Sequence, residues 1–305
     1  MKTTSLIHPQ VITGTLCAGM LLCLTAGASA QNLFASIGSS ANGQIFEYSP
    51  SGVPTLIASG QDYPQGIAFN YAGDLFIANT ALNAGESGNI TKISRAGVQS
   101  TFASGIDPSD LAFNNAGFLF QSDYQSGNIY KYTTAGMQST FATGLANPLA
   151  LTFDSSGNLF VGAGYGAGNG YIEEITPGGA KSTFATGLTF PTGLAFNGAG
   201  DLFACNQSAG IIYEYTPAGV RSTFATLSQT DLDGLAFDSS GNLFVTGGNS
   251  GDLIEISPSG TPSIFASGKP FVVGVAFQPV PEPSTLALLA VGASAVAFRL
   301  RRKAS

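Results

Sequence analysis

The chain has 305 residues, of which 40 are glycine, 44% are hydrophobic and 10% are charged, and its formal net charge is −7. Residues 31–280 hold 6 Lys and Arg against 17 Asp and Glu, a net charge of −11, with one cysteine (Cys205) and no histidine. These numbers exclude a disulfide framework, a Cys/His zinc site and histidine-dependent catalysis in that region. Such an acidic surface also repels nucleic acid.

The first 30 residues have the layout of a secretory signal peptide. Lys2 gives a positive start, residues 11–26 are mostly apolar, and Ala28-Ser29-Ala30 is the small-residue pattern that signal peptidase cuts after. Export across the inner membrane through the Sec translocon, cleavage after Ala30 and a mature start at Gln31 are therefore expected. An uncleaved N-terminal anchor is the alternative.

Residues 31–280 contain a unit of four short elements that recurs with a period of 40 to 44 residues. The first element ends at Phe69, Phe113, Phe153, Phe196, Phe237 and Phe277. The second contains Leu-Phe, at Phe34, Phe76, Phe120, Phe160, Phe203 and Phe244. The third alternates apolar and polar residues, at 45–48, 90–93, 129–132, 172–175, 212–215 and 253–256. The fourth is a Phe-Ala strand at Phe102, Phe141, Phe184, Phe224 and Phe265, with Ile57 in its place in the first copy.

Four short strands per period of this length predict an all-β fold, a six-bladed β-propeller of four-stranded blades over residues 31–280. The period-2 alternation of the third element is typical of a strand with one covered face. The region begins with a second-type strand and ends with a first-type strand. The N- and C-terminal strands are therefore expected to close one mixed blade, which leaves no open sheet edge in the ring.

The turn between the first two strands of a repeat reads Asn/Asp-x-x-Gly, at residues 70–73, 114–117, 154–157, 197–200 and 238–241. An Asx side chain at the first position bonds a backbone N–H, and Gly accepts the positive φ that closes the hairpin. These carboxylates are predicted to close turns, each in its own blade.

The stretch from Pro191 to Phe203, PTGLAFNGAGDLF, resembles the repeats of NHL and SMP-30/gluconolactonase-like propellers, and is also similar to those of virginiamycin B lyases. The resemblance lies in blade-forming residues, so it implies the fold more than the activity. The gluconolactonase-like enzymes hold a divalent cation with Glu, Asn and Asp in the central channel, and no Glu precedes a first strand here. The lyases depend on a histidine, which residues 31–280 lack.

A ligand site is expected on the loops at one end of the channel. The candidate Ca²⁺ or Mg²⁺ ligands are the carboxylates of Asp107, Asp110, Asp123, Asp231 and Asp233, because both ions take oxygen ligands. Further polar residues of the same loops are Asp62, Asn79, Asn147, Asn206 and Asn249. The competing interpretation is that all of these are solvated loop residues and that the protein holds no cofactor.

Other patterns are interpreted structurally. Glu173 and Glu174 are neighbours on a strand and point to opposite faces, so they do not form a carboxylate pair. The glycines of residues 162–170 precede a strand and not a helix, so they form a loop and not a phosphate site. Cys205 is expected to be buried in its strand. A set of tyrosines is available to stack on sugar rings, at Tyr48, Tyr63, Tyr124, Tyr165 and Tyr171.

The last 25 residues resemble the PEP-CTERM sorting signal of Gram-negative bacteria. Pro281, Glu282 and Pro283 precede an apolar run at residues 284–298, and a basic cluster follows at Arg299, Arg301, Arg302 and Lys303. The run is expected to form a single transmembrane helix, about 22 Å long at 1.5 Å per residue, with the basic end in the cytoplasm. The resemblance implies recognition by an exosortase and an association with exopolysaccharide and biofilm matrix. Permanent anchoring by residues 284–298 is the alternative to cleavage.

Three functions remain open from the sequence. The first is a non-catalytic cell-surface or matrix module that binds exopolysaccharide or other surface proteins. The second is a metal-dependent hydrolase of the lactonase type, and the third is a matrix spacer without a small-molecule ligand.

Overall fold

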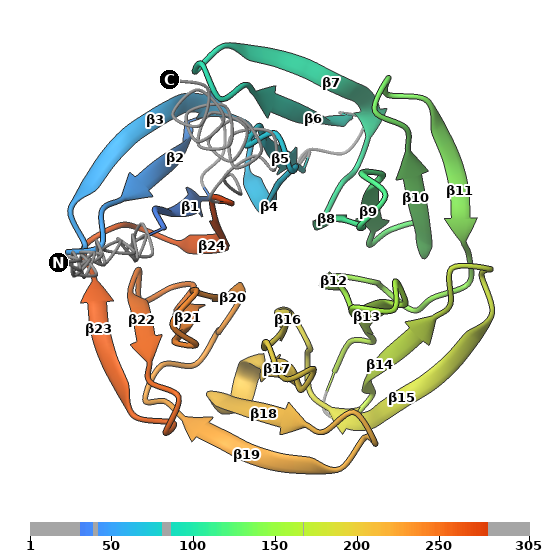
Figure 1. The fold of residues 1–305 in the computed structure, drawn as a ribbon, viewed down its shortest axis with the longest axis vertical. Helices are drawn as coiled ribbons and strands as arrows, with labels where there is room; N and C mark the ends of the chain where they lie inside the picture. Colours follow the sequence, from blue (N-terminus) through green and yellow to red (C-terminus); the bar gives the residue numbers. More distant parts are fainter. Residues whose placement is uncertain (1–30, 39–41, 81–86, 167, 280–305) are drawn as a thin grey trace, which may run out of the picture.

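The computed structural model describes residues 31–38, 42–80, 87–166 and 168–279, which form a closed ring of six four-stranded antiparallel sheets (Figure 1). The predicted six-bladed propeller is thereby confirmed. The expected signal peptide and the sorting tail lie outside the described residues. Within the described residues, no helix has the length and apolar character needed to cross a bilayer.

Each blade runs from an innermost to an outermost strand. Blade 1 consists of β24 (Val272–Phe277), β1 (Leu33–Ile37), β2 (Gly43–Tyr48) and β3 (Pro54–Gln61). Blade 2 consists of β4 (Pro64–Phe69), β5 (Leu75–Asn79), β6 (Gly88–Ile93) and β7 (Gln99–Ile106). Blade 3 consists of β8 (Leu111–Phe113), β9 (Leu119–Asp123), β10 (Asn128–Tyr132) and β11 (Gln138–Ala142). Blade 4 consists of β12 (Leu151–Phe153), β13 (Leu159–Ala163), β14 (Gly170–Ile175) and β15 (Lys181–Leu188). Blade 5 consists of β16 (Leu194–Phe196), β17 (Leu202–Asn206), β18 (Ile211–Tyr215) and β19 (Arg221–Thr226). Blade 6 consists of β20 (Leu235–Phe237), β21 (Leu243–Thr246), β22 (Leu253–Ile256) and β23 (Pro262–Ala266). A short 3₁₀ helix, Gln207–Ala209, connects β17 to β18.

Blade 1 closes the ring with strands from both ends of the described chain. β1 pairs antiparallel with β24, with Leu33 opposite Phe277 and Ala35 opposite Val275. The backbone N–H of Gln278 extends the ladder by donating to the carbonyl of Asn32 at 3.1 Å. The predicted mixed blade is confirmed, and the innermost and second strands of blade 1 are paired as in every other blade.

One aromatic contact is repeated between all neighbouring blades. The second-strand phenylalanine of each blade meets the first-strand phenylalanine of the next blade edge-to-face, with ring centroids 4.9–5.1 Å apart. The six pairs are Phe34–Phe69, Phe76–Phe113, Phe120–Phe153, Phe160–Phe196, Phe203–Phe237 and Phe244–Phe277. In blades 2 to 6 the same second-strand ring also packs edge-to-face on the fourth-strand phenylalanine of its own blade. In blade 1, Ile57 packs in that cluster instead, as the repeat predicts.

The hairpin turns between first and second strands use the predicted Asx chemistry. Asn197 is representative: its Oδ1 accepts the backbone N–H groups of Ala199 and Asp201, both at 2.9 Å. Gly200 then closes the turn with a φ of 90°, which residues with a side chain rarely adopt. The carboxylates of Asp154 and Asp238 accept equivalent bonds in blades 4 and 6, so these acids serve turn closure.

A core substitution tests the contribution of the aromatic contacts. Phe160 packs on Phe184 at 5.1 Å and on Phe196 at 5.0 Å, so Phe160→Ala should lower the free energy of unfolding by about 3–5 kcal/mol. Met137→Ala, at a side chain that is 72% exposed, is the matched control and should change it by less than about 0.5 kcal/mol. Urea unfolding measures both, and an equal effect of the two variants would contradict this packing scheme.

Candidate functional site

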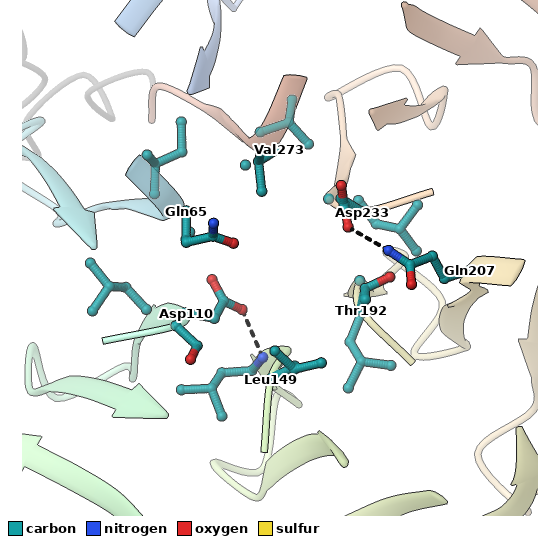
Figure 2. A pocket seen from close by; sticks show the side chains of 18 of the residues that line it. Gln65, Asp110, Leu149, Thr192, Gln207, Asp233 and Val273 are labelled. Atoms are coloured by element: carbon teal, nitrogen blue, oxygen red, sulfur yellow. Dashed lines mark hydrogen bonds between the residues drawn. The ribbon is translucent and has the colours of Figure 1, made fainter. Parts of the chain in front are cut away.

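A cavity of about 340 Å³ opens at the centre of the ring, where the innermost strands of the blades converge. Its wall combines the carboxylates of Asp110, Asp231 and Asp233 with amides, hydroxyls and three aromatic rings. Figure 2 shows Gln65, Asp110, Leu149, Thr192, Gln207, Asp233 and Val273 arranged around the opening. The lining contains neither Lys nor Arg, so no cationic side chain of the described residues neutralises the carboxylates in the wall.

Every blade reaches this cavity through an equivalent four-residue stretch, which precedes the innermost strand in four blades and includes the first three residues of β4 and β24 in the other two. The stretches are residues 63–66, 107–110, 147–150, 190–193, 231–234 and 271–274. The third residue of each stretch lines the cavity, and these residues are Gln65, Ser109, Leu149, Thr192, Asp233 and Val273. The repeat therefore fixes six backbone positions around the channel and varies the side chain at each of them.

The first residue of the stretch has an unusual backbone conformation in four blades. Tyr63, Asn147, Asp231 and Phe271 have φ values of 46°, 50°, 62° and 54°, in the left-handed region. Such a conformation costs a non-glycine residue about 1–3 kcal/mol and persists only where the surroundings impose it. Three of these four residues, Tyr63, Asp231 and Phe271, line the cavity. The chain thus holds two bulky rings and a carboxylate at the entrance in a conformation that it would otherwise avoid.

Hydroxyl groups on second strands help to hold three of the channel positions. Ser122 Oγ accepts the backbone N–H of Asp110 and donates to the carbonyl of Leu149 in the next blade, at 3.0 and 2.6 Å. Ser36 and Thr246 make the same two contacts in blades 1 and 6. Each hydroxyl ties its own innermost strand to the neighbouring one. Cys205 stands at the corresponding position of blade 5 and is buried in β17, as predicted. Burial raises the pKa of its thiol, so the reactive thiolate is disfavoured.

Asp110 departs from the repeat pattern. Asp110 is the fourth residue of its stretch. Four of the six stretches have Gly at the fourth position, and the stretch of blade 4 has Ala150 there. The Asp110 carboxylate accepts the backbone N–H of Leu151 from the neighbouring blade at 2.8 Å. Burial in the channel wall raises the pKa of Asp110 to about 7, against the hydrogen bonds from Leu151 and Leu111, which lower it. Asp110 therefore holds a proton more readily than an exposed aspartate does.

Asp233 lies across the channel from Asp110. The two residues belong to blades 6 and 3, which are opposite each other in a ring of six (Figure 2). Asp233 Oδ1 accepts a hydrogen bond from Gln207 Nε2 at 3.1 Å. Burial raises the pKa of Asp233 to about 7, the Gln207 hydrogen bond lowers it and the nearby Asp231 charge raises it. Asp231 in turn accepts a hydrogen bond from Asn249 Nδ2 at 2.6 Å.

The five carboxylates predicted as metal ligands are not all in one place. Asp110, Asp231 and Asp233 line the cavity, whereas Asp107 and Asp123 are not part of its wall. The Asp123 side chain accepts the backbone N–H groups of Gln125 and Ser126 and so closes the turn after β9. Among residues 31–38, 42–80, 87–166 and 168–279, no group of three or more Asp, Glu, His or Cys side chains is arranged to hold a metal ion. Because Asp110 faces Asp233 across the channel, the carboxylates do not converge on a common point.

The remaining polar candidates have mixed positions. Asn249 lines the cavity, whereas Asn79 is buried and donates to Gln61, Asn89 and Thr91. Sequence reasoning missed Gln65, Thr192, Gln207, Phe190 and Phe271, all of which line the cavity. For Gln65, Thr192, Phe190 and Phe271, the position just before or at the start of the repeated Phe-ending element was the available clue, because the blade fixes that position. Gln207 follows β17, where the repeat gives no such clue.

The structure also shows the positions of the Glu173–Glu174 pair and of the strands around the glycine-rich segment. Glu173 accepts a hydrogen bond from Thr183, and Glu174 accepts one from Asn158, so the two carboxylates have different partners. In the glycine-rich segment, β13 ends at Ala163 and β14 begins at Gly170, so the chain between them connects two strands.

Comparison with protein families identifies the end of the chain, where residues 279–303 match the PEP-CTERM protein-sorting motif. The chain carries a PEP-CTERM sorting signal. The signal indicates export, membrane-anchored sorting through the C-terminal region and processing by an exosortase. No curated protein matches the chain in sequence.

Three solved structures are similar to this chain in fold and have low sequence identity to it. A chain of a nidogen/laminin complex has 17% identity and a TM-score of 0.72, covering 83% of this chain and 99% of that one. A putative gluconolactonase has 15% identity and a TM-score of 0.63, covering 78% and 89%. A virginiamycin B lyase from Staphylococcus aureus has 16% identity and a TM-score of 0.54, covering 67% and 69%. At these identities the similarity shows the fold alone.

The raised pKa of Asp110 predicts a pH dependence of stability. The folded pKa of about 7 exceeds that of an unfolded Asp, about 3.9, so the folded state binds the proton more tightly. The free energy of unfolding should therefore fall as the pH rises from about 4 to about 7. Asp110→Asn keeps an oxygen that accepts the Leu151 N–H and removes the titration. Its melting temperature should exceed that of the wild type at pH 8, with the difference shrinking toward pH 4. Parallel melting profiles of the two proteins across this range would contradict the assignment.

Proposed function

We propose that this exported propeller is a non-catalytic binding module of the exopolysaccharide or biofilm matrix and that its channel mouth is the ligand site. The cavity carries the proposal, because it combines aromatic faces with fixed hydrogen-bonding groups in one enclosed space. The sorting signal, which indicates export and membrane-anchored sorting, supports this location.

The aromatic groups at the mouth suit a sugar ring. Tyr63 and Phe271 come from adjacent blades, and their ring centroids are 6.1 Å apart. Phe190 lines another part of the wall, and its ring packs edge-to-face on the exposed Tyr165. Sugars present apolar C–H faces edged by hydroxyls, so they match flat rings beside carboxyl and amide groups.

The charge of the wall restricts the kind of sugar. The lining has three Asp and no Lys or Arg, and residues 31–280 carry a net charge of −11. An acidic sugar would bring a further negative charge next to Asp110 and Asp233, where burial already disfavours the charged form of the carboxyl groups and raises their pKa. A neutral sugar avoids this repulsion, and the protonated amine of an amino sugar would be attracted to the carboxylates. We therefore expect neutral or amino-sugar polymers to bind and uronic acid polymers to bind weakly.

A divalent-metal-dependent hydrolase of the lactonase type is the second candidate. The carboxyl groups of Asp110 and Asp233 favour it, because a pKa of about 7 suits a general acid or base at neutral pH. The fold likeness to a putative gluconolactonase is consistent with it. The opposite placement of the two residues in the ring argues for separate contacts to a ligand and against a shared metal.

Aromatic substitutions test the binding site. Tyr63→Ala and Phe271→Ala should each weaken binding of neutral or amino-sugar oligomers by about 1 kcal/mol or more, which is roughly fivefold or more in the dissociation constant. Tyr71→Ala is the matched control, since Tyr71 is 69% exposed in the hairpin turn between β4 and β5, outside the cavity wall, and should bind as the wild type. Isothermal titration calorimetry with neutral, amino and uronic acid oligomers measures these differences.

Equal binding by the Tyr63, Phe271 and Tyr71 variants would place the ligand elsewhere. Turnover of lactones that is abolished by EDTA and by Asp233→Asn would instead establish the hydrolase. In that case an added divalent ion at 100 times its dissociation constant should stabilise the fold by about 2.7 kcal/mol. The same thermal melts with EDTA and with Ca²⁺ or Mg²⁺ detect that shift.

A further inference from the structure

The propeller has two faces that differ in their chain elements. We call the face formed by the hairpin turns, between first and second and between third and fourth strands, the turn face. The opposite loop face consists of the connections between second and third strands and between blades, and it contains the channel mouth. Cavity-lining residues such as Phe271 and Asn249 belong to these connections. The antiparallel order of every blade keeps the two faces apart by the length of a strand.

The sorting signal leaves from the centre of the turn face. β24 starts beside the channel mouth, where Val273 lines the cavity, and runs as the innermost strand of blade 1 to Phe277 (Figure 1). Six strand residues span about 20 Å at 3.3 Å each. A second cavity confirms which face Phe277 reaches, because Phe277 lines it together with Ser49 and Ser239 of two hairpin turns. The sorting signal is thus attached on the side away from the candidate ligand site.

The tether between the propeller and the membrane segment is short. From Phe277 to Ser284, where the apolar run begins, there are seven residue steps, which reach about 25 Å at full extension. A domain of about 250 residues has a radius of gyration near 18 Å. To bring the loop face to the bilayer, the tether would have to pass along a radius and then the thickness of the disc, about 40 Å in all. The tether is too short for this.

The outer turns of the turn face suit a lipid surface. These are the turns between third and fourth strands, at residues 49–53, 94–98, 133–137, 176–180, 216–220 and 257–261. Arg95 is the single charged residue among them, although residues 31–280 are strongly acidic. Of the eight large apolar side chains exposed in the described residues, five are in turns of this face: Val53, Tyr71, Val98, Met137 and Val220. One of the eight, Tyr165, is in a connection of the loop face.

The carboxylates in the turns of the turn face belong to its inner turns, where local contacts engage them. Four more acids lie on third strands, two residues before the outer turns: Glu47, Glu174, Glu214 and Glu255. Asp154 and Asp238 accept hydrogen bonds within their own turns, and Asp74 forms an ion pair with Lys92 at 2.7 Å. The loop face is different. The turns and strand ends of the turn face carry eight acids and five basic residues, whereas the connections and strand ends of the loop face carry one lysine, Lys269, against seven acids. These acids are Asp62, Asp107, Asp110, Asp123, Asp231, Asp233 and Asp252. An anionic lipid surface repels this face more strongly than the outer turns.

We propose that the propeller stands on its turn face at the surface of the bilayer that holds the sorting signal, with the channel mouth directed away from the membrane. The occupant of the turn face is the lipid headgroup layer. Two features favour this contact: the chain leaves the turn face near its centre on a short tether, and the outer turns of this face are apolar and contain no carboxylate. This orientation does not depend on which ligand the channel binds.

Site-directed labelling of residues 31–305 in anionic vesicles, with the sorting signal uncleaved, tests the orientation. This chain begins at the expected mature start and lacks Cys17 and Cys23, so Cys205 is its one native cysteine. A fluorophore is attached to Val98→Cys or Val220→Cys on the turn face and to Gln125→Cys or Ser208→Cys on the loop face. All four sites are exposed, whereas Cys205 is buried. Quencher-bearing lipids should quench the two turn-face labels and leave the two loop-face labels at their intensity in quencher-free vesicles. Equal quenching on both faces, or stronger quenching at Gln125 and Ser208, would overturn the proposal.

Charge variants separate lipid contact from simple proximity. With the Val98 label in place, Val220→Asp should reduce its quenching in anionic vesicles but not in neutral ones. Ser208→Asp is the matched control on the loop face and should have no effect on that quenching. Unchanged quenching with Val220→Asp in both vesicle types would show that the outer turns do not contact lipid. Thermal melts of the exposed-site variants establish that each one is folded.

Discussion

The edge-to-face contact between phenylalanines of neighbouring blades is the interaction on which the rest of the structure depends. It occurs six times with nearly the same geometry, and each ring lies on a strand that also pairs within its own blade. Because a four-stranded sheet of this size buries little apolar area alone, the blade depends on its neighbours for a core. The ring is therefore cooperative, and pairing of β24 with β1 lets both neighbours of blade 1 make the same contact.

Closure also fixes where the functional parts of the chain are placed. The stretch that leads into each innermost strand, or begins it, lies at the channel, so the residues that vary between blades gather at one mouth. The strand that completes blade 1 carries the chain to the opposite face, from which the sorting signal continues. The candidate ligand site and the end of β24, from which the sorting signal continues along the chain, are thus separated by the thickness of the propeller. In the proposed orientation, that separation leaves the mouth accessible while the sorting signal is held in the membrane.

The fold was predictable from the sequence because the repeat encodes it locally. Recurring phenylalanines mark the strands, Asx-x-x-Gly marks the turns, and the strand type at each end predicts the mixed blade. The site was predictable only in part. Asp110, Asp231 and Asp233 were placed at the mouth, but Asp123 follows the same logic and closes a turn instead. Whether carboxylates from blades 3 and 6 meet or oppose each other depends on the number of blades around the ring, a global property. The raised pKa values of Asp110 and Asp233 depend on burial that only the assembled channel produces.

Hydrogen exchange of the native protein followed by mass spectrometry tests ring closure most directly. If β24 closes the ring against β1, amides of Leu33–Ile37 and Val272–Phe277 should be protected as strongly as those of β16 and β17 in blade 5. Both segments should also lose protection together with the remaining blades as denaturant is raised. Rapid exchange of these two segments under native conditions, with blade 5 still protected, would contradict a closed six-bladed ring.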